Sequence, residues 1–179
     1  MHSYQSVIVT WMFVCIGLIF LPAAKVITAP LHETIKRAES YILESQNNDG
    51  GWPLVRGGES GIEIASFAMQ ALMFKGWGTG SRVIRGGVGY LTNHQEEDGS
   101  WNGNTAHTIF ALIALTQAET DADARFKGLR WLKEAQNENG TWGRKMHRPG
   151  NSLYTAAVLA GLKRLGFSAN FSPASRGAD

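Results

Sequence analysis

One phrase recurs three times along the chain, and this repetition constrains the fold more than any other feature. In each copy an aromatic residue stands five positions before a glutamine, and a tryptophan stands six positions after it. The copies follow at intervals of 49 and 41 residues, as the pairs Gln46/Trp52, Gln95/Trp101 and Gln136/Trp142. Periods of this size are typical of arrays in which one supersecondary unit is repeated.

Each copy predicts two helices joined by the segment between glutamine and tryptophan. The first helix is amphipathic, as in the third copy, where Phe126, Leu129 and Leu132 recur at helical spacing among charged residues. The helix after the tryptophan is apolar on nearly every side, which is typical of a buried helix. We therefore predict three hairpins of an outer and an inner helix, over residues 32–76, 81–118 and 121–166.

Every copy places Asp-Gly or Asn-Gly between the glutamine and the tryptophan. This is turn chemistry, because glycine readily adopts the positive φ that follows a helix end. We expect the glutamine amide to satisfy backbone groups left open at the helix ends, and the tryptophan to cover the junction. We interpret this segment, here called the joint, as structural, since a catalytic site would not need three copies.

Length and charge limit the classes of function. The chain has 179 residues, which is the size of one domain, and 44% of them are hydrophobic, which is enough for a core. The net charge is +2 with 18% charged residues, so no basic stripe points to nucleic acid. We predict no nucleic-acid partner.

The N-terminus predicts export. Residues 7–21 form an apolar run that is short for a membrane span, which needs about 20 residues. Small residues follow at Ala23, Ala24 and Ala29, as in a secretory signal, so we predict a signal peptide over residues 1–29 and a secreted or periplasmic protein. No Lys or Arg precedes the run, so an uncleaved membrane anchor remains the alternative.

The rest of the chain divides into a repeat domain, residues 30–166, and a polar tail, residues 167–179, that we expect to be disordered. The single cysteine, Cys15, lies inside the apolar run. A mature chain would then have no disulfide and no thiolate ligand.

The order of aromatic residue, glutamine, Asp/Asn-Gly and tryptophan resembles the QW-type repeat of the squalene–hopene cyclase and protein prenyltransferase superfamily. The resemblance covers residues 32–166 and implies an all-α fold, in which hairpins form an α/α toroid around a central cavity. A complete toroid has about twice the three hairpins predicted here, so we expect half of an α/α toroid, with six helices in inner and outer layers. A homodimer or another protein chain would close the ring.

The residues that carry the chemistry of these families are not found. Class II terpene cyclases use an Asp-x-Asp-Asp motif, and the nearest string, residues 121–124, lacks the final Asp and opens an outer helix. We interpret Asp121 and Asp123 as capping residues. Protein prenyltransferases bind zinc through Asp, Cys and His, a set that a mature chain without Cys lacks. We predict no metal and no cofactor.

A second resemblance concerns the first joint alone. The string QNNDGGWP, residues 46–53, is similar to a phrase of secreted pectate lyases, which also fold as α/α toroids. A polysaccharide enzyme of that kind is therefore a further alternative, although nothing here assembles the calcium and arginine residues of those enzymes.

Aligning the inner helices gives the candidate site residues. His107 aligns with Ile64 and Tyr154, and Glu63 lies one position earlier on the first inner helix. His107 and Glu63 are the candidate acids or bases; the structural alternatives are a hydrogen-bonded core histidine and a helix-dipole partner. The candidate ligand-cavity residues are Phe67, His107, Phe110 and Tyr154.

Two loops carry candidate anion contacts. Arg144, Lys145 and Arg148 follow the third joint and Arg56 follows the first. Such residues at one end of a ring would meet an anionic group such as a diphosphate. A solvated loop is the alternative.

Two functions from different classes follow. The first is a non-catalytic binding or interaction module for an apolar, isoprenoid-like ligand or a partner chain, favoured by the missing Asp-x-Asp-Asp motif. The second is a terpene-cyclase-like enzyme that acts as a dimer, with His107 or Glu63 as the acid. Whether the protein is an enzyme stays open at this point.

Overall fold

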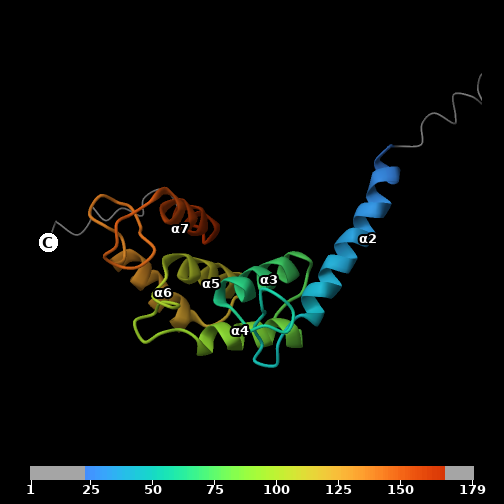
Figure 1. Ribbon diagram of the computed structural model, residues 1–179, viewed down its shortest axis with the longest axis horizontal. Helices are drawn as coiled ribbons and strands as arrows, with labels where there is room; N and C mark the ends of the chain where they lie inside the picture. Colours follow the sequence, from blue (N-terminus) through green and yellow to red (C-terminus); the bar gives the residue numbers. More distant parts are fainter. Residues whose placement is uncertain (1–22, 168–179) are drawn as a thin grey trace, which may run out of the picture. The chain divides into compact units, whose positions relative to one another are not determined.

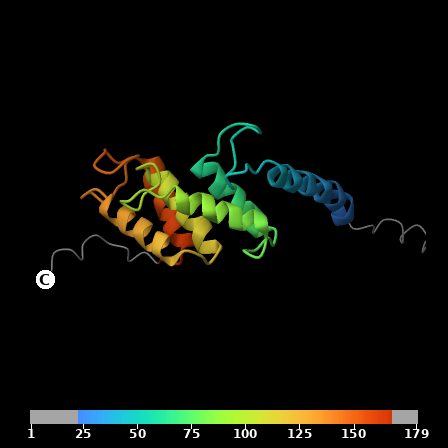
Figure 2. The same cartoon turned by 90° about the horizontal axis from the view of Figure 1, so that it is seen from below.

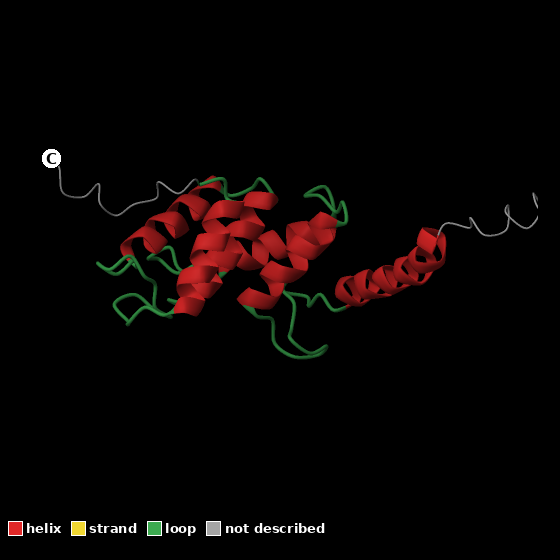
Figure 3. Ribbon diagram, turned by 90° about the horizontal axis from the view of Figure 1, so that it is seen from above, coloured by secondary structure: helices red, strands yellow, loops and turns green. Residues whose placement is uncertain are grey.

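The computed structural model describes residues 23–167, with side chains from Pro30 onward. This part of the chain is all-α (Figure 3). The apolar run, Cys15 and the tail from residue 168 lie outside the described residues. Contacts divide the chain into two compact units, with the boundary between Tyr41 and Ile42. Among the described helices, none combines the length and the hydropathy needed to cross a membrane.

The first unit contains most of helix α2 (Ala23–Glu44), which begins nine residues before the predicted hairpin at residue 32. Pro30 lies within this helix, and the Thr34 hydroxyl donates to the Pro30 carbonyl oxygen at 2.9 Å. Three large apolar side chains of α2 are exposed: Leu31, Ile35 and Tyr41.

The second unit contains five helices in two layers. The inner layer is α3 (Ile62–Phe74), α5 (Thr105–Gln117) and α7 (Ser152–Arg164), and the outer layer is α4 (Arg82–Asn93) and α6 (Ala122–Glu134). Figures 1 and 2 show the two layers. Helix α5 packs between α3 and α7, and residues 111–115 are buried all round. The predicted all-α partial toroid with inner and outer helices is confirmed.

The outer helices pack mainly on the inner helix that precedes them, α4 on α3 and α6 on α5. The sequence had grouped each outer helix with the inner helix that follows it. Glycines allow this approach: a Cβ at Gly87 would lie 2.6 Å from the Met69 sulfur, and a Cβ at Gly128 would lie 2.9 Å from Leu112. Any larger residue would separate the two layers.

The three joint tryptophans are themselves part of the core. Trp52, Trp101 and Trp142 are 2%, 0% and 1% exposed. We expected these rings to cover the junction from solvent, with one face of the joint below them. Instead each ring is enclosed on all sides, so the expectation of a covering role was wrong for Trp142 as for the other two. None of the three indoles is open to a ligand.

Each buried indole makes the same hydrogen bond. Its N–H donates to the carbonyl ten residues earlier, in the last turn of the preceding outer helix, at 2.8, 2.7 and 2.8 Å for Ile42, Leu91 and Leu132. Carbonyls in a last helical turn have no partner inside the helix. The indole rather than the glutamine therefore satisfies the helix end, and that expectation for the glutamine was wrong.

The inner helix that follows also holds two of these tryptophans. The backbone N–H of Trp101 donates to the Thr108 hydroxyl of α5 at 3.1 Å, and that of Trp142 donates to the Thr155 hydroxyl of α7 at 3.1 Å. Both threonines stand four positions after the N-cap of their helix. The burial of Trp142 therefore comes from contacts within its own copy, between Leu132 on α6 and Thr155 on α7.

The glutamine amides have a different role. In the first joint, the Gln46 amide donates to the Gly50 carbonyl at 2.9 Å and to the Val83 carbonyl, in the first turn of α4, at 2.8 Å. In the second joint, Gln95 repeats this with Gly99 at 2.9 Å and Ala124 at 2.8 Å. These two glutamines therefore connect one copy to the outer helix of the next.

Capping explains where the helices begin. The side chains of Asn104, Asn151 and Ser81 each accept a hydrogen bond from a backbone N–H in the first turn of their helices. Asp121 does the same for α6, accepting from the Ala124 N–H at 3.0 Å. The capping interpretation of Asp121 is confirmed, and Asp123 forms an ion pair with Lys127 at 2.6 Å.

Candidate functional site

The inner helices share one register, which fixes the level of each candidate side chain. Their N-cap residues are Gly61, Asn104 and Asn151. The third helical position is therefore Ile64 in α3, His107 in α5 and Tyr154 in α7, and Glu63 lies one position earlier.

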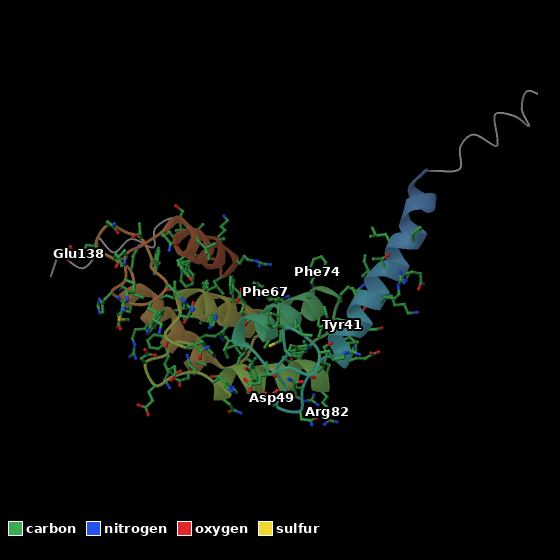
Figure 4. All side chains as sticks on the ribbon, viewed as in Figure 1. Tyr41, Asp49, Phe67, Phe74, Arg82 and Glu138 are labelled. Carbon is green, nitrogen blue, oxygen red and sulfur yellow. The ribbon has the colours of Figure 1, made fainter. Side chains whose placement is uncertain are left out.

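An aromatic pair joins α3 and α5. The rings of Phe67 and Phe110 lie 4.7 Å apart between centroids with an interplanar angle of 47°. Such tilted pairs are a favoured geometry for aromatic side chains. Phe67 remains 44% exposed, and with Phe74 it projects from the side of α3 opposite α4 (Figure 4). The equivalent residue of α7 is Ala157, so the pair is not continued on the third inner helix.

His107 is half-buried at the N-terminal end of α5. Its Nδ1 lies 3.1 Å from the side-chain nitrogen of Asn102, which is a donor, so Nδ1 accepts and the ring proton of the neutral imidazole is on Nε2. Burial lowers the pKa of His107, the Glu63 carboxylate raises it, and Arg144 lowers it. Burial is the largest effect, so the imidazole is neutral near neutral pH.

Glu63 lies in the first turn of α3 and is exposed. A carboxylate there interacts favourably with the helix dipole. It is also near enough to influence the pKa of His107, so Glu63, His107 and Arg144 form one electrostatic group at the N-terminal ends of α3 and α5.

The basic loop, residues 143–150, is held against the beginning of α5. The backbone N–H of Thr105 donates to the Arg144 carbonyl at 2.9 Å, and the Thr105 hydroxyl donates to the Gly143 carbonyl at 2.7 Å. Arg144, Lys145 and Arg148 follow directly on the buried Trp142, and Arg144 and Arg148 are exposed. The loop therefore presents cations at the same end of α5 as His107.

Two predicted residues lie apart from this group. Tyr154 is half-buried on α7 and packs against the core. Arg56 follows the first joint and forms an ion pair with Glu44 at 3.2 Å.

Sequence reasoning did not find Asn102 and Thr105, which fix the His107 tautomer and the basic loop. Asn102 has a φ of 57°, in the left-handed region that asparagine tolerates better than most residues. The Asn-Gly string after Trp101 is the signal that could have indicated it.

Other features of the described chain stand outside this group. Residues 23–167 contain no cluster of three His, Cys, Asp or Glu side chains placed to hold a metal ion. A surface hollow of about 410 Å³ lies at the other end of α3 and α5, where Trp77 and Thr79 of the linker face Gln117 and Glu119.

No family model matches the chain. Three curated relatives do. Drimenyl diphosphate synthase from Streptomyces showdoensis is 32% identical over 147 residues, or 74% of this chain and 27% of the relative. Squalene–hopene cyclase from Zymomonas mobilis is 29% identical over 126 residues, or 60% of this chain and 19% of the relative. Alpha-2-macroglobulin from Thermotoga maritima is 34% identical over 74 residues, or 40% of this chain and 5% of the relative.

The two-layered helical array defines a partial α/α toroid. The chain is a distant homologue of the terpene cyclase family. It spans 27% of the length of the synthase and 19% of the length of the cyclase, so it corresponds to a small part of those proteins.

Proposed function

We propose that the protein is a non-catalytic binding module. Its inner helices hold an apolar, isoprenoid-like ligand at Phe67 and Phe110, and the basic loop meets an anionic head group on that ligand. The observation that carries the proposal is the aromatic pair, which is preassembled on adjacent inner helices and still open to solvent.

The aromatic pair supports an apolar ligand for an energetic reason. Full burial of a phenylalanine side chain contributes about 1.5–3 kcal/mol. Phe67 is 44% exposed, so a ligand that covers it gains part of this free energy. The ring contact with Phe110 already orders both side chains, so less conformational entropy is lost when the ligand binds.

The basic loop supports an anionic head group. Arginine guanidinium groups bind phosphate oxygens through paired N–H donors, and lysine adds a point charge. Arg144 lies close enough to His107 to affect its pKa, so the loop and the inner helices share one end of the layer. The name of the relative drimenyl diphosphate synthase makes an isoprenoid diphosphate the first ligand class to test.

The acid groups favour binding over catalysis. A cyclase of this class starts its reaction by protonating a carbon–carbon double bond, which needs a strong, enclosed acid. Burial lowers the pKa of His107, so its imidazole is neutral near neutral pH and is a poor source of protons. Glu63 is exposed to water, and Asp121 is occupied as a helix cap.

The second candidate function is a terpene-cyclase-like enzyme that acts as a dimer. The proximity of Glu63 to His107 favours it, since a second subunit that covered both groups would exclude water and change their pKa values. Export is part of both proposals and rests on residues 1–29. N-terminal sequencing of protein recovered outside the cytoplasm tests it: an N-terminus near residue 25 or 30 supports a cleaved signal, and an intact Met1 contradicts it.

Calorimetric titration of the full chain tests the binding proposal. We expect farnesyl diphosphate to bind more tightly than farnesol or inorganic diphosphate, because it alone engages both the aromatic pair and the basic loop. Phe67→Ala should weaken binding about tenfold, which corresponds to about 1.4 kcal/mol. The control is Phe126→Ala on the outer helix α6, which is 66% exposed. Equal losses in the two variants, or no binding at all, would contradict the proposal.

Product analysis separates the two functions. The full chain is incubated with farnesyl diphosphate or squalene, and the extract is analysed by gas chromatography with mass spectrometry. A module returns the substrate unchanged, whereas an enzyme gives a cyclised product that disappears in Glu63→Ala or His107→Ala. A module in either variant keeps its ligand, so binding and turnover are read independently.

A further inference from the structure

The first two joints form a repeated seat for the next outer helix. The glutamine amide bonds to a carbonyl that lies twelve positions before the glutamine of the next copy, Val83 in α4 and Ala124 in α6. The joint glycine also packs directly on the backbone of that helix, since a Cβ at Gly99 would lie 2.6 Å from the Lys127 carbonyl oxygen. Together these contacts fix both the position and the register of the outer helix.

The third joint offers the same seat without an outer helix among the described residues. The Gln136 amide donates to its own loop at Gly140, 2.8 Å away, and no further helix of the described chain lies beside it. The Gln136 carbonyl oxygen is buried without a hydrogen-bond partner. A Cβ at Gly140 would meet only the Gln136 amide, at 3.8 Å, where Gly99 meets helix backbone.

Helix α7 is open at the corresponding position. Counting from the N-caps, Leu159 of α7 is equivalent to Met69 of α3 and Leu112 of α5. The two equivalent residues are 0% exposed beneath α4 and α6, whereas Leu159 is 57% exposed. The side of α7 that would receive an outer helix is therefore uncovered in the described chain.

Helix α2 carries the matching pattern. Twelve positions before its own glutamine stands Thr34, where α4 has Val83 and α6 has Ala124. Eight positions before it stands Ala38, a small residue where α4 and α6 have Gly87 and Gly128. Ile35, Ala38 and Tyr41 are exposed and lie along one stripe of the helix.

We propose that α2 of a second copy of this chain occupies the seat formed by α7 and the third joint. The Gln136 amide donates to the Thr34 carbonyl of the second copy, and Ala38 of that copy packs over Leu159. The occupant is a second copy because this chain itself supplies a helix with the required acceptor, small residue and apolar stripe at the required spacing. The contact continues the two interfaces already present between α3 and α4 and between α5 and α6. It does not depend on the proposed ligand.

Directed disulfide formation tests the contact. All chains are full length and carry Cys15→Ser, and Ala38→Cys and Leu159→Cys are placed on separate chains with different tags. A Cβ at Gly87 would lie 2.6–2.7 Å from side-chain atoms of Met69, so the equivalent cysteines should be close enough to bond. We expect a cross-linked species that carries both tags, formed in the mixture and not by either variant alone. Absence of this species in the mixture would overturn the proposal.

Sedimentation velocity over a range of concentrations gives the second test. We expect the full chain to associate, and Leu159→Glu and Ala38→Trp each to weaken association at least tenfold. The matched controls are Leu153→Glu, on α7 and 72% exposed, and Ser40→Trp, on the exposed side of α2. The substituted residues are exposed, so the variants keep their fold. A monomer at every concentration, or association unchanged in both variants, would contradict the proposal.

Discussion

Two regions of each repeat carry different kinds of information, the joint and the N-terminal end of the inner helix. In the joints, the same indole-to-carbonyl and amide-to-loop bonds occur in all three copies, within about 0.1 Å. At the inner helix ends, one level holds Ile64, His107 and Tyr154, three different chemistries. Repetition marks the contacts that build the array, and variation marks the positions that are free to take on a function.

The largest effect is expected at the joint tryptophan. Trp101→Ala should destabilise the protein by about 3–5 kcal/mol, because it empties a fully buried site and leaves the Leu91 carbonyl without its partner. Trp142→Ala should cost a similar amount, since its indole is equally buried and bonds to Leu132. Chemical denaturation followed by circular dichroism measures both losses. The half-buried linker residue Trp77 is the control, and effects no larger than that of Trp77→Ala would break the distinction between joint and surface.

A glycine pair on α4 should give effects of opposite sign. A Cβ at Gly87 would collide with Met69 and Trp52, so Gly87→Ala should cost about 1–3 kcal/mol. A Cβ at Gly89 meets open space, so Gly89→Ala should stabilise the helix by about 0.5–1 kcal/mol. The two denaturation midpoints should lie on opposite sides of the wild-type value. If both variants moved the same way, close packing of α4 on α3 would be the wrong explanation.

The glutamines compare a completed joint with an open one. Gln95→Leu removes a bond to the next outer helix as well as one to its own loop, and should cost about 1–3 kcal/mol. Gln136→Leu removes only the loop bond and should cost less at protein concentrations where the chain is monomeric. Denaturation of both variants under one condition measures the difference. Equal losses would show that the inter-repeat bond contributes little.

The smallest effect concerns the pH dependence of stability. The folded protein lowers the pKa of His107, so the unfolded chain binds more protons below the ordinary histidine pKa of about 6.5. Stability should therefore be highest above that pH and be lost as the pH falls through the folded pKa. His107→Gln should flatten this dependence, whereas His147→Gln in the exposed loop should not. An unchanged profile in His107→Gln would remove the argument from burial.

The sequence was sufficient for the layers because their signals are local and repeated. The amphipathic and apolar periods distinguished outer from inner helices, and alignment on the tryptophan placed Glu63 and His107 at the levels that the N-caps Gly61 and Asn104 define. The capping role of Asp121 followed from its position before an amphipathic run.

Contacts across the array were not accessible in the same way. Which inner helix an outer helix packs on depends on the path of the connecting loops, and no period within one helix encodes it. The pairing of the Trp142 indole with the Leu132 carbonyl, and of Gln46 with Val83, also joins residues whose proximity exists only after folding. For the site, the loop contact of Thr105 was hidden for the same reason.

The comparison between joint and inner face is tested most directly by one titration of farnesyl diphosphate against Gln95→Leu and Phe67→Ala, with the stability of each variant measured in the same buffer. The account predicts that Gln95→Leu loses stability and keeps the wild-type affinity, while Phe67→Ala keeps stability and loses affinity about tenfold. If Phe67→Ala bound the ligand as tightly as the wild type, the inner face would not be the binding site, and the central claim would be wrong.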